Sequence, residues 1–271
     1  MADQPLLGKV AIVTGAGRLR GIGRATAVAL AELGCDVTVT GTGRDPKTFP
    51  PDEQAADWRD IESTAEQVRG LGRRCLPLVV DISDSGQVQG MVDQTVADLG
   101  RVDILVNNAA FARGPDRVPL LEMDEKIFRR VLEVKVVGAF LCTRAVAAAM
   151  IAQGQGGRII NMSSGAAPSG MINASAYSGA NAALEGMTRT WAREFGRHNI
   201  LVNAVRPGIV DTHRMDDLGR GERWAAAQAS ILLGRASTDE EVGKFIAFLC
   251  TDATSRVTGQ CLNFGGGSVF Y

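Results

Sequence analysis

The sequence has few cysteines and no pattern among them. Its five cysteines are widely spaced and odd in number: Cys35, Cys75, Cys142, Cys250 and Cys261. No C-x-x-C pair occurs, so neither a disulfide framework nor a zinc site is expected, and scattered thiols are typical of a reducing compartment. Residues 1–9 lack the long apolar stretch of a signal peptide. We therefore expect a cytoplasmic protein that binds no metal.

An excess of charge of one sign is also missing. The formal net charge is −1, so no bulk field attracts the chain to nucleic acid or to anionic lipid. The apolar run 145–152 is much shorter than the roughly 20 apolar residues of a membrane helix. Apolar residues form 45% of the 271 residues and charged residues 22%, which is typical of a globular chain with a substantial core. Small molecules are the expected partners.

Buried strands alternate with helices along the whole chain. The expected strand 10–14, helix 24–33 and strand 36–40 form a βαβ unit. The alternation continues with strands at 75–80, 102–106, 158–162, 200–205 and 260–264, and with helices at 59–71, 87–99, 124–153, 175–195 and 239–249. Repeated βα units predict an α/β fold, a doubly wound parallel sheet of Rossmann type with helices on both faces. No linker divides the chain, so 1–271 is predicted to be a single domain.

Two segments interrupt the alternation. Residues 41–57 contain Pro46, Pro50 and Pro51 among charged residues, and we expect an extended loop there. Residues 212–237 follow the end of a strand, which is where doubly wound folds bind ligands. We predict that 212–237 is a substrate lid.

A glycine-rich turn joins the first strand to the first helix. Gly15, Gly17, Gly21 and Gly23 would let the backbone approach a pyrophosphate, and the helix that begins near Ile22 would offer its free N–H groups. Because the motif stands between a strand and a helix, it predicts a dinucleotide site. The arginines within the turn, Arg18 and Arg20, either lie near the phosphates or are solvated loop charges.

These motifs resemble those of the short-chain dehydrogenase/reductase family. The turn is similar to T-G-x-x-x-G-x-G, with two extra residues before Gly21, and Asn107–Ala110 is similar to N-N-A-G. Pro207–Thr212 is similar to P-G-x-x-x-T, and 258–260 with 265–266 match the family's C-terminal signature. The resemblance covers residues 6–267, and it is closest to the 3-oxoacyl-carrier-protein-reductase-like branch.

The resemblance implies how the cofactor is held. Asp81 and Ile82 would lie beside the adenine, and Asn108 belongs to the N-N-A-G-like motif. The remaining expected contacts are those of the turn that cradles the nicotinamide, with its threonine on a phosphate: Pro207, Gly208, Ile209 and Thr212.

The nucleotide is predicted from the end of the second strand. An acidic residue there would bind the ribose 2′-hydroxyl of NAD, but the family alignment places Gly41 at this position. Thr42, Arg44 and also Arg18 could bind a 2′-phosphate. NADP is therefore predicted, with NAD as the alternative because Asp45 could still turn inward.

The resemblance also implies the catalytic residues, with one departure. Ser164 and Tyr177 have the spacing of the family's serine and tyrosine, where the tyrosine exchanges a proton with the substrate. The family places a lysine four residues after the tyrosine, because a cation lowers the pKa of a phenol. Here that residue is Asn181. Lys135, in turn, stands where the family has an asparagine, so the two positions have exchanged residue types.

Two functions from different classes remain open. The first is hydride transfer between NADP(H) and a ketone or secondary alcohol, with Tyr177 as general acid–base and Lys135 as the required cation. Lys135 could instead be an ordinary surface lysine, although its helical neighbours are apolar. The second function is a catalytically silent, cofactor-binding regulatory or scaffolding protein.

The apolar faces 136–149 and 180–191 favour a homo-oligomer, and by the family resemblance a tetramer.

Overall fold

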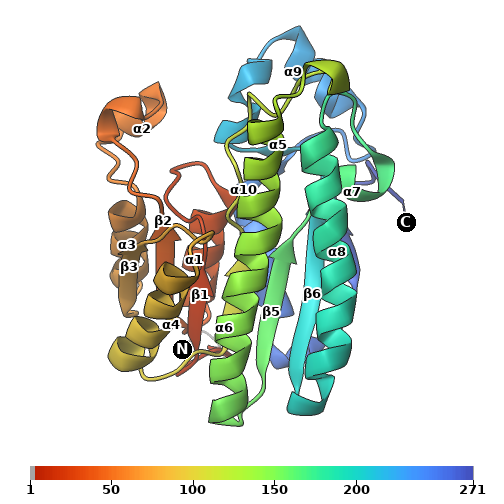
Figure 1. Cartoon of the computed structure of the whole chain (residues 1–271). Coiled ribbons are helices and arrows are strands. Elements are labelled where there is room, and N and C mark those ends of the chain that lie inside the picture. Colours follow the sequence, from red (N-terminus) through yellow and green to blue (C-terminus); the bar gives the residue numbers. More distant parts are fainter. Residues whose placement is uncertain (1–3, 271) are drawn as a thin grey trace.

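A computed structural model describes residues 4–270, and its centre is one parallel sheet (Figure 1). The seven strands lie in the order β3-β2-β1-β4-β5-β6-β9, and every neighbouring pair is parallel. In chain order their bounds are Val10–Val13 (β1), Asp36–Gly41 (β2), Cys75–Val79 (β3), Ile104–Asn107 (β4), Gly157–Met162 (β5), Ile200–Pro207 (β6) and Cys261–Phe264 (β9). The predicted fold class is confirmed, and β1 is central with the chain order reversing beside it.

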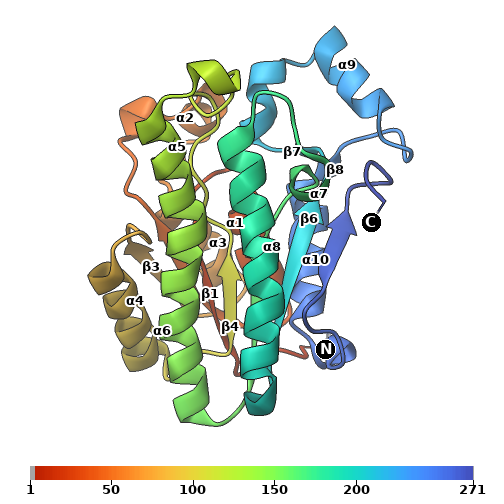
Figure 2. The same ribbon diagram turned by 45° about the vertical axis from the view of Figure 1, so that its right-hand side comes forward.

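Helices cover both faces of the sheet. One face packs against α1 (Ile22–Glu32), α3 (Ile61–Gly70) and α10 (Asp239–Leu249). The other face packs against α4 (Ser85–Leu99), α6 (Gly138–Gln153) and α8 (Ser175–Phe195), which stand in front of the strands in Figure 2. Side chains of β1 alternate between the two cores: Ala11 and Val13 join the first, and Ile12 the second. Helices shield both faces of the sheet from solvent, which explains why the strands are continuous apolar runs.

The proline-rich segment 41–57 is more ordered than the sequence indicated. It contains a 3-10 turn, η1 (Pro46–Thr48), and a short helix, α2 (Pro51–Ala55). The expectation of an extended loop was wrong, because proline at the first position of a helix starts it rather than breaking it. Asp52 and Glu53 then occupy the first turn, where carboxylates are favourable.

The predicted helix 124–153 is one long rod with a local irregularity. It consists of α5 (Glu125–Leu132), a π turn, η3 (Glu133–Val137), and α6. By length and composition this rod could cross a membrane, which the comparison of the run 145–152 alone did not reveal. In the structure α6 packs against β4, β5 and α4, and the side that faces them contributes its buried residues to the core: Ala139, Leu141, Cys142, Val146, Ala147 and Met150.

The segment 212–237 stands above the carboxyl ends of the strands. It contains η5 (His213–Leu218) and α9 (Glu222–Ala229). Two short strands, β7 (Val210–Asp211) and β8 (Ser237–Thr238), pair at its base and hold its two ends together. A segment that is joined at its base and extends over the sheet edge has the geometry that a lid requires.

Candidate active site and nucleotide site

The turn between β1 and α1 needs its glycines for close packing. Gly15 has a φ of +68°, and a Cβ added to it would lie 2.8 Å from the Cα of Ala109. A Cβ on Gly23 would lie 2.4 Å from the carbonyl oxygen of Gly15. Gly21 has no side chain to cap α1, and its own N–H donates to Asp239 at 2.8 Å, so the N–H groups that follow Gly21 are the ones open to an anion. This cradle fits the pyrophosphate of a dinucleotide.

Asn108 fixes this turn from the neighbouring strand. Its side-chain amide donates to the carbonyl oxygens of Thr14 and Gly15, each at 2.9 Å. The hydroxyl of Thr14 in turn accepts from the backbone N–H groups of Asn108 and Ala109. The N-N-A-G-like motif at the end of β4 therefore fixes the shape of the predicted pyrophosphate cradle.

Carboxylates hold the two arginines of the glycine-rich turn. Arg20 lies 2.7 Å from Asp52 and 2.6 Å from Asp216, which belongs to the predicted lid. Arg18 lies 3.4 Å from Glu53, whose side chain is buried. In this structure neither arginine is a free positive charge, and their ion pairs join the glycine-rich turn to α2 and to the predicted lid.

Two carboxylates that the sequence analysis missed lie beside the end of β2. A Cβ on Gly17 would fall 1.7 Å from the Oδ1 of Asp60, and one on Gly41 would fall 3.5 Å from its Oδ2. Arg44 binds this carboxylate at 3.1 Å and binds Glu53 at 2.8 Å. No sequence motif indicated Asp60 or Glu53, because both come from the segment after β2 and reach it through the tertiary fold. Thr42 is exposed.

The residues expected beside the adenine lie after β3. Asp81 accepts from the hydroxyl of Ser83 at 2.6 Å and from Arg130 at 2.9 Å. The Ser83 hydrogen bond, with help from Arg130, lowers the pKa of Asp81 below its ordinary value. Ile82 is buried, and its Cδ1 would lie 2.6 Å from a Cβ on Gly138.

The predicted nicotinamide turn follows β6. A Cβ on Gly208 would lie 2.8 Å from the Cα of Gly265, so the two turns pass too closely for any side chain. Pro207 accepts a hydrogen bond from the N–H of Gly165, which ties the turn to the segment that carries Ser164. Ile209 accepts from the N–H of Ser237, at the base of the lid. The fourth residue of the prediction, Thr212, is buried with 6% of its surface exposed.

Ser164 and Tyr177 lie at the carboxyl-end edge of the sheet. Ser164 follows β5, and its hydroxyl accepts from the N–H of Ala166 at 3.2 Å. Tyr177 lies in the first turn of α8. The guanidinium of Arg117 lies 4.0 Å from the centre of its ring, and that of Arg214 lies 5.6 Å from it. Neither arginine belongs to a motif, and sequence reasoning missed both.

Lys135 is buried on the π turn, and this turn packs against α8. Within residues 4–270 its ammonium makes no hydrogen bond and no ion pair. Burial, with the nearby charge of Arg214, lowers the pKa of Lys135 from 10.5 to about 7. A buried lysine without a partner is costly. The structure therefore excludes the view that Lys135 is an ordinary surface lysine.

Asn181 also has an unsatisfied group. Its amide nitrogen donates to the backbone carbonyl of Tyr177 at 2.8 Å. Its Oδ1 is buried and has no hydrogen-bond partner among the described residues. Asn181 therefore has an unused acceptor on α8, the helix that packs against the π turn carrying Lys135.

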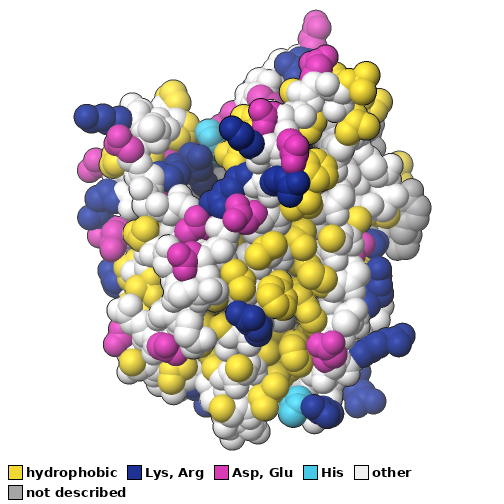
Figure 3. Space-filling view, viewed as in Figure 1, with side chains coloured by type: hydrophobic (Ala, Val, Ile, Leu, Met, Phe, Trp, Pro, Cys, Tyr) yellow, Lys and Arg dark blue, Asp and Glu magenta, His cyan; other side chains and the backbone are white. Residues whose placement is uncertain are grey.

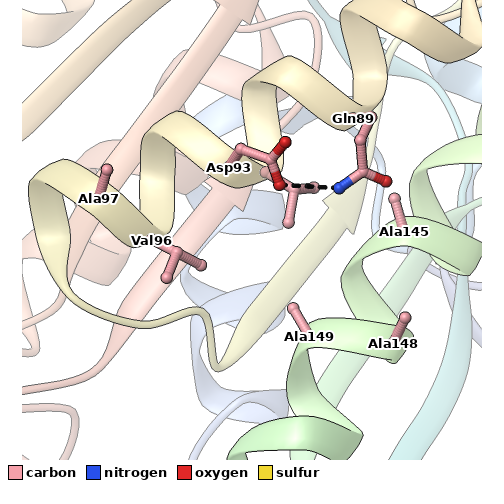
Figure 4. Close-up of a pocket in the computed structure, with 8 residues that line it drawn as sticks. Gln89, Asp93, Val96, Ala97, Ala145, Ala148 and Ala149 are labelled. Atoms are coloured by element: carbon pink, nitrogen blue, oxygen red, sulfur yellow. Dashed lines mark hydrogen bonds between the residues drawn. The ribbon is translucent and has the colours of Figure 1, made fainter.

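The hollows of the surface divide into two kinds. A groove of about 450 Å³ between α4 and α6 is lined by alanine and valine side chains and by Gln89 and Asp93, which bond to each other (Figure 4). It contains none of the predicted site residues. By contrast, Figure 3 shows a hollow at the edge near α2 and α5 in which Lys and Arg side chains gather. The basic hollow is on the side of the carboxyl ends, where the predicted residues lie.

The sequence and structure of this chain match those of known proteins over nearly its whole length. A sequence model of a family described as enoyl-(acyl carrier protein) reductase matches residues 15–268. Short chain dehydrogenase/reductase astE of Aspergillus oryzae is 39% identical over 266 residues, which cover 97% of this chain and 95% of that protein. The 3-oxoacyl-[acyl-carrier-protein] reductase FabG of Thermotoga maritima is 34% identical and covers 97% and 99% respectively. The crystal structure of acetoin dehydrogenase from Enterobacter cloacae superposes with a TM-score of 0.79 at 36% identity, covering 97% and 96%.

Proposed function

Because this chain belongs to the short-chain dehydrogenase/reductase family of oxidoreductases, we propose that it interconverts a ketone and a secondary alcohol, with Tyr177 as the general acid–base. The nicotinamide ring of the bound dinucleotide supplies or accepts the hydride. In reduction, the phenol of Tyr177 donates its proton to the carbonyl oxygen, and the hydroxyl of Ser164 donates a hydrogen bond to the same oxygen. The observation that carries this proposal is the presence of Ser164, Tyr177 and a buried cation at one edge of the sheet.

Lys135 is proposed to perform the task of the lysine that is missing at position 181. A cation near the phenol favours its deprotonated form, so that the proton can leave and return near neutral pH. The burial of Lys135, its lack of a partner and its proximity to Arg214 support this role. Asn181 would orient the ammonium through a water molecule, because its Oδ1 is the unsatisfied acceptor.

For the nucleotide we propose NADP(H), with Arg44 and Thr42 as ligands of the 2′-phosphate and NAD(H) as the second candidate. Arg44 supports NADP(H), since it follows β2 and Gly41 carries no acid. The Asp60 carboxylate supports NAD(H), because it lies against Gly17 and Gly41, where a ribose hydroxyl could donate to it. The two candidates differ in whether Arg44 leaves Asp60 for the phosphate.

The proposal is tested by exchanging the two residues. Lys135→Ala should reduce turnover of a diketone and cyclic-ketone panel by roughly 100-fold or more, while dinucleotide affinity changes little. Asn181→Ala should cost less. The double variant Lys135→Asn with Asn181→Lys should recover part of the activity that Lys135→Asn loses. Lys126→Ala, which removes an exposed lysine of α5, is the matched control.

Two outcomes would contradict this proposal. Near-wild-type turnover in Lys135→Ala would mean that another group supplies the charge. If the wild-type chain binds a dinucleotide by calorimetry but oxidises neither NADPH nor NADH with any ketone of the panel, the silent, cofactor-binding alternative is favoured.

A further inference from the structure

Positive charge is concentrated around Tyr177. Arg117 stacks on its ring and Arg214 lies beyond it, at 4.0 and 5.6 Å from the ring centre. Arg113 and Lys135 belong to the same group: Arg113 and Arg214 act electrostatically on Arg117, and Arg214 acts on Lys135. Burial, together with the charges of Arg214 and Arg113, lowers the pKa of Arg117 from its ordinary value against the opposing effect of Asp116.

Carboxylates balance only part of this charge. Arg117 pairs with the buried Asp116 at 2.6 Å, and Arg113 pairs at 3.0 Å with Asp217, whose side chain is 53% exposed. Neither Arg214 nor Lys135 has an acidic partner in the part of the chain that the structure describes. The vicinity of the catalytic tyrosine therefore keeps an uncompensated positive charge.

Several donors of these arginines are also unused. Arg214 donates from Nη1 to the carbonyl oxygen of Phe111 at 2.8 Å, but its Nη2 is buried without a partner among residues 4–270. The Nε atoms of Arg113 and Arg117 are likewise buried and unpaired within that range. Buried donors without acceptors are unfavourable, so a ligand that accepts hydrogen bonds from these groups would be stabilised here.

We propose that the substrate is an acidic carbonyl compound, whose carboxylate binds Arg214 and Arg117 while its carbonyl oxygen faces Tyr177. The inference rests on the proposed function of the same site. A planar guanidinium can donate two parallel hydrogen bonds to a carboxylate, and both arginines are partly shielded from water, where such bonds are strongest. Since Arg214 belongs to the predicted lid and Arg117 follows β4, a carboxylate between them would draw the lid onto the body of the protein.

The test uses matched acids and esters. The probes are 2-, 3- and 4-oxopentanoate and their methyl esters, which keep the carbonyl and remove the charge. Binding is measured by calorimetry with the oxidised dinucleotide present, so that no reduction occurs, and kcat/KM is measured separately with the reduced dinucleotide. At least one acid should bind roughly 10- to 100-fold more tightly than its ester.

Arginine variants locate the effect. Arg214→Gln should remove most of the preference for the acid, and Arg214→Lys should restore part of it because the charge returns. Arg223→Gln, which changes an exposed arginine of the same segment, should leave the preference unchanged. Equal binding of acids and esters, no acid binding below about 10 mM, or an unchanged preference in Arg214→Gln would each overturn the inference.

The two proposals fail in different ways. If the esters are reduced as fast as the acids and bind as tightly, the oxidoreductase function stands and the acidic substrate is wrong. If the acids bind in an Arg214-dependent manner but no oxo acid or ester is reduced, the carboxylate site stands and the proposed function is wrong.

Discussion

The guanidinium of Arg117 stacks 4.0 Å above the ring of Tyr177, which joins the loop after β4 to the first turn of α8. A cation over an aromatic face holds both side chains in place and excludes water from one side of the ring. Arg117 is itself fixed by the buried Asp116. The orientation of the tyrosine is thus controlled from a segment that carries no family motif.

We expect Lys135→Met to stabilise the protein while it removes activity. The pKa of Lys135 is about 7 in the folded protein against 10.5 ordinarily, so the unfolded chain binds more protons between these values and stability rises with pH across this range. Below pH 7 the amine is protonated in both the folded and the unfolded state, so the folded protein bears the full free-energy cost of burying the charge. Because one pKa unit corresponds to about 1.4 kcal/mol, the variant should gain up to about 5 kcal/mol at pH 6.

Thermal or urea unfolding of both proteins at pH 6 and pH 9 measures this effect. The gain of Lys135→Met over wild type should be larger at pH 6 than at pH 9. An equal gain at both values, or a loss of stability at pH 6, would mean that the lysine is paired in solution.

The same titration should appear in catalysis. If the Lys135 ammonium is required, log(kcat/KM) for carbonyl reduction falls as pH rises through about 7, since the amine loses its proton there. In Lys135→Arg the guanidinium stays charged, so the fall should be absent up to about pH 9. A pH profile that is identical in the two proteins would assign the titration to another group.

The preference for NADP(H) or NAD(H) should depend on whether Arg44 or Asp60 contacts the adenosine ribose of the bound nucleotide. For an NADP enzyme, Arg44→Ala should weaken binding of NADP⁺ by roughly 10-fold or more, with little change for NAD⁺. For an NAD enzyme, Asp60→Asn should weaken NAD⁺ and improve NADP⁺, because a hydroxyl acceptor and a repelling charge are both removed. Calorimetric dissociation constants for the two nucleotides decide between them, and Asp57→Asn, which changes an exposed carboxylate of the same segment, is the control.

Self-association should cover the apolar face of α6 and α8. Phe140 and Val137 are 41% and 43% exposed, and hydrophobic side chains spread over the front of the molecule in Figure 3. We propose a homotetramer, in which such faces pair across two-fold axes. Sedimentation at micromolar concentration should show an oligomer that Phe140→Glu dissociates. Only monomer in the wild-type chain would be incompatible with this prediction.

The sequence predicted the elements that periodicity and motifs encode. The strands of the sheet and the helices that cover it lie within a few residues of their expected bounds. Short continuous apolar runs that alternate with helical patterns indicate buried parallel strands. Helix α2 was not predicted, because prolines among charged residues indicated a loop in 41–57. Asp60, Arg117 and Arg214 were missed for a different reason: their roles depend on tertiary contacts between distant segments, and charged loop residues have no period.

The π turn at Glu133–Val137 makes the site sensitive to the length of the chain as well as to its composition. A π turn holds one residue more than a regular helical turn, and each residue of an α-helix corresponds to about 100° of rotation. Deleting a single residue here would restore a regular hydrogen-bond ladder, which keeps α5 and α6 in phase but changes the directions of the side chains within the turn. Lys135 would then leave its buried place without any substitution. A one-codon deletion could therefore separate the cation from the tyrosine while leaving every catalytic residue in the sequence.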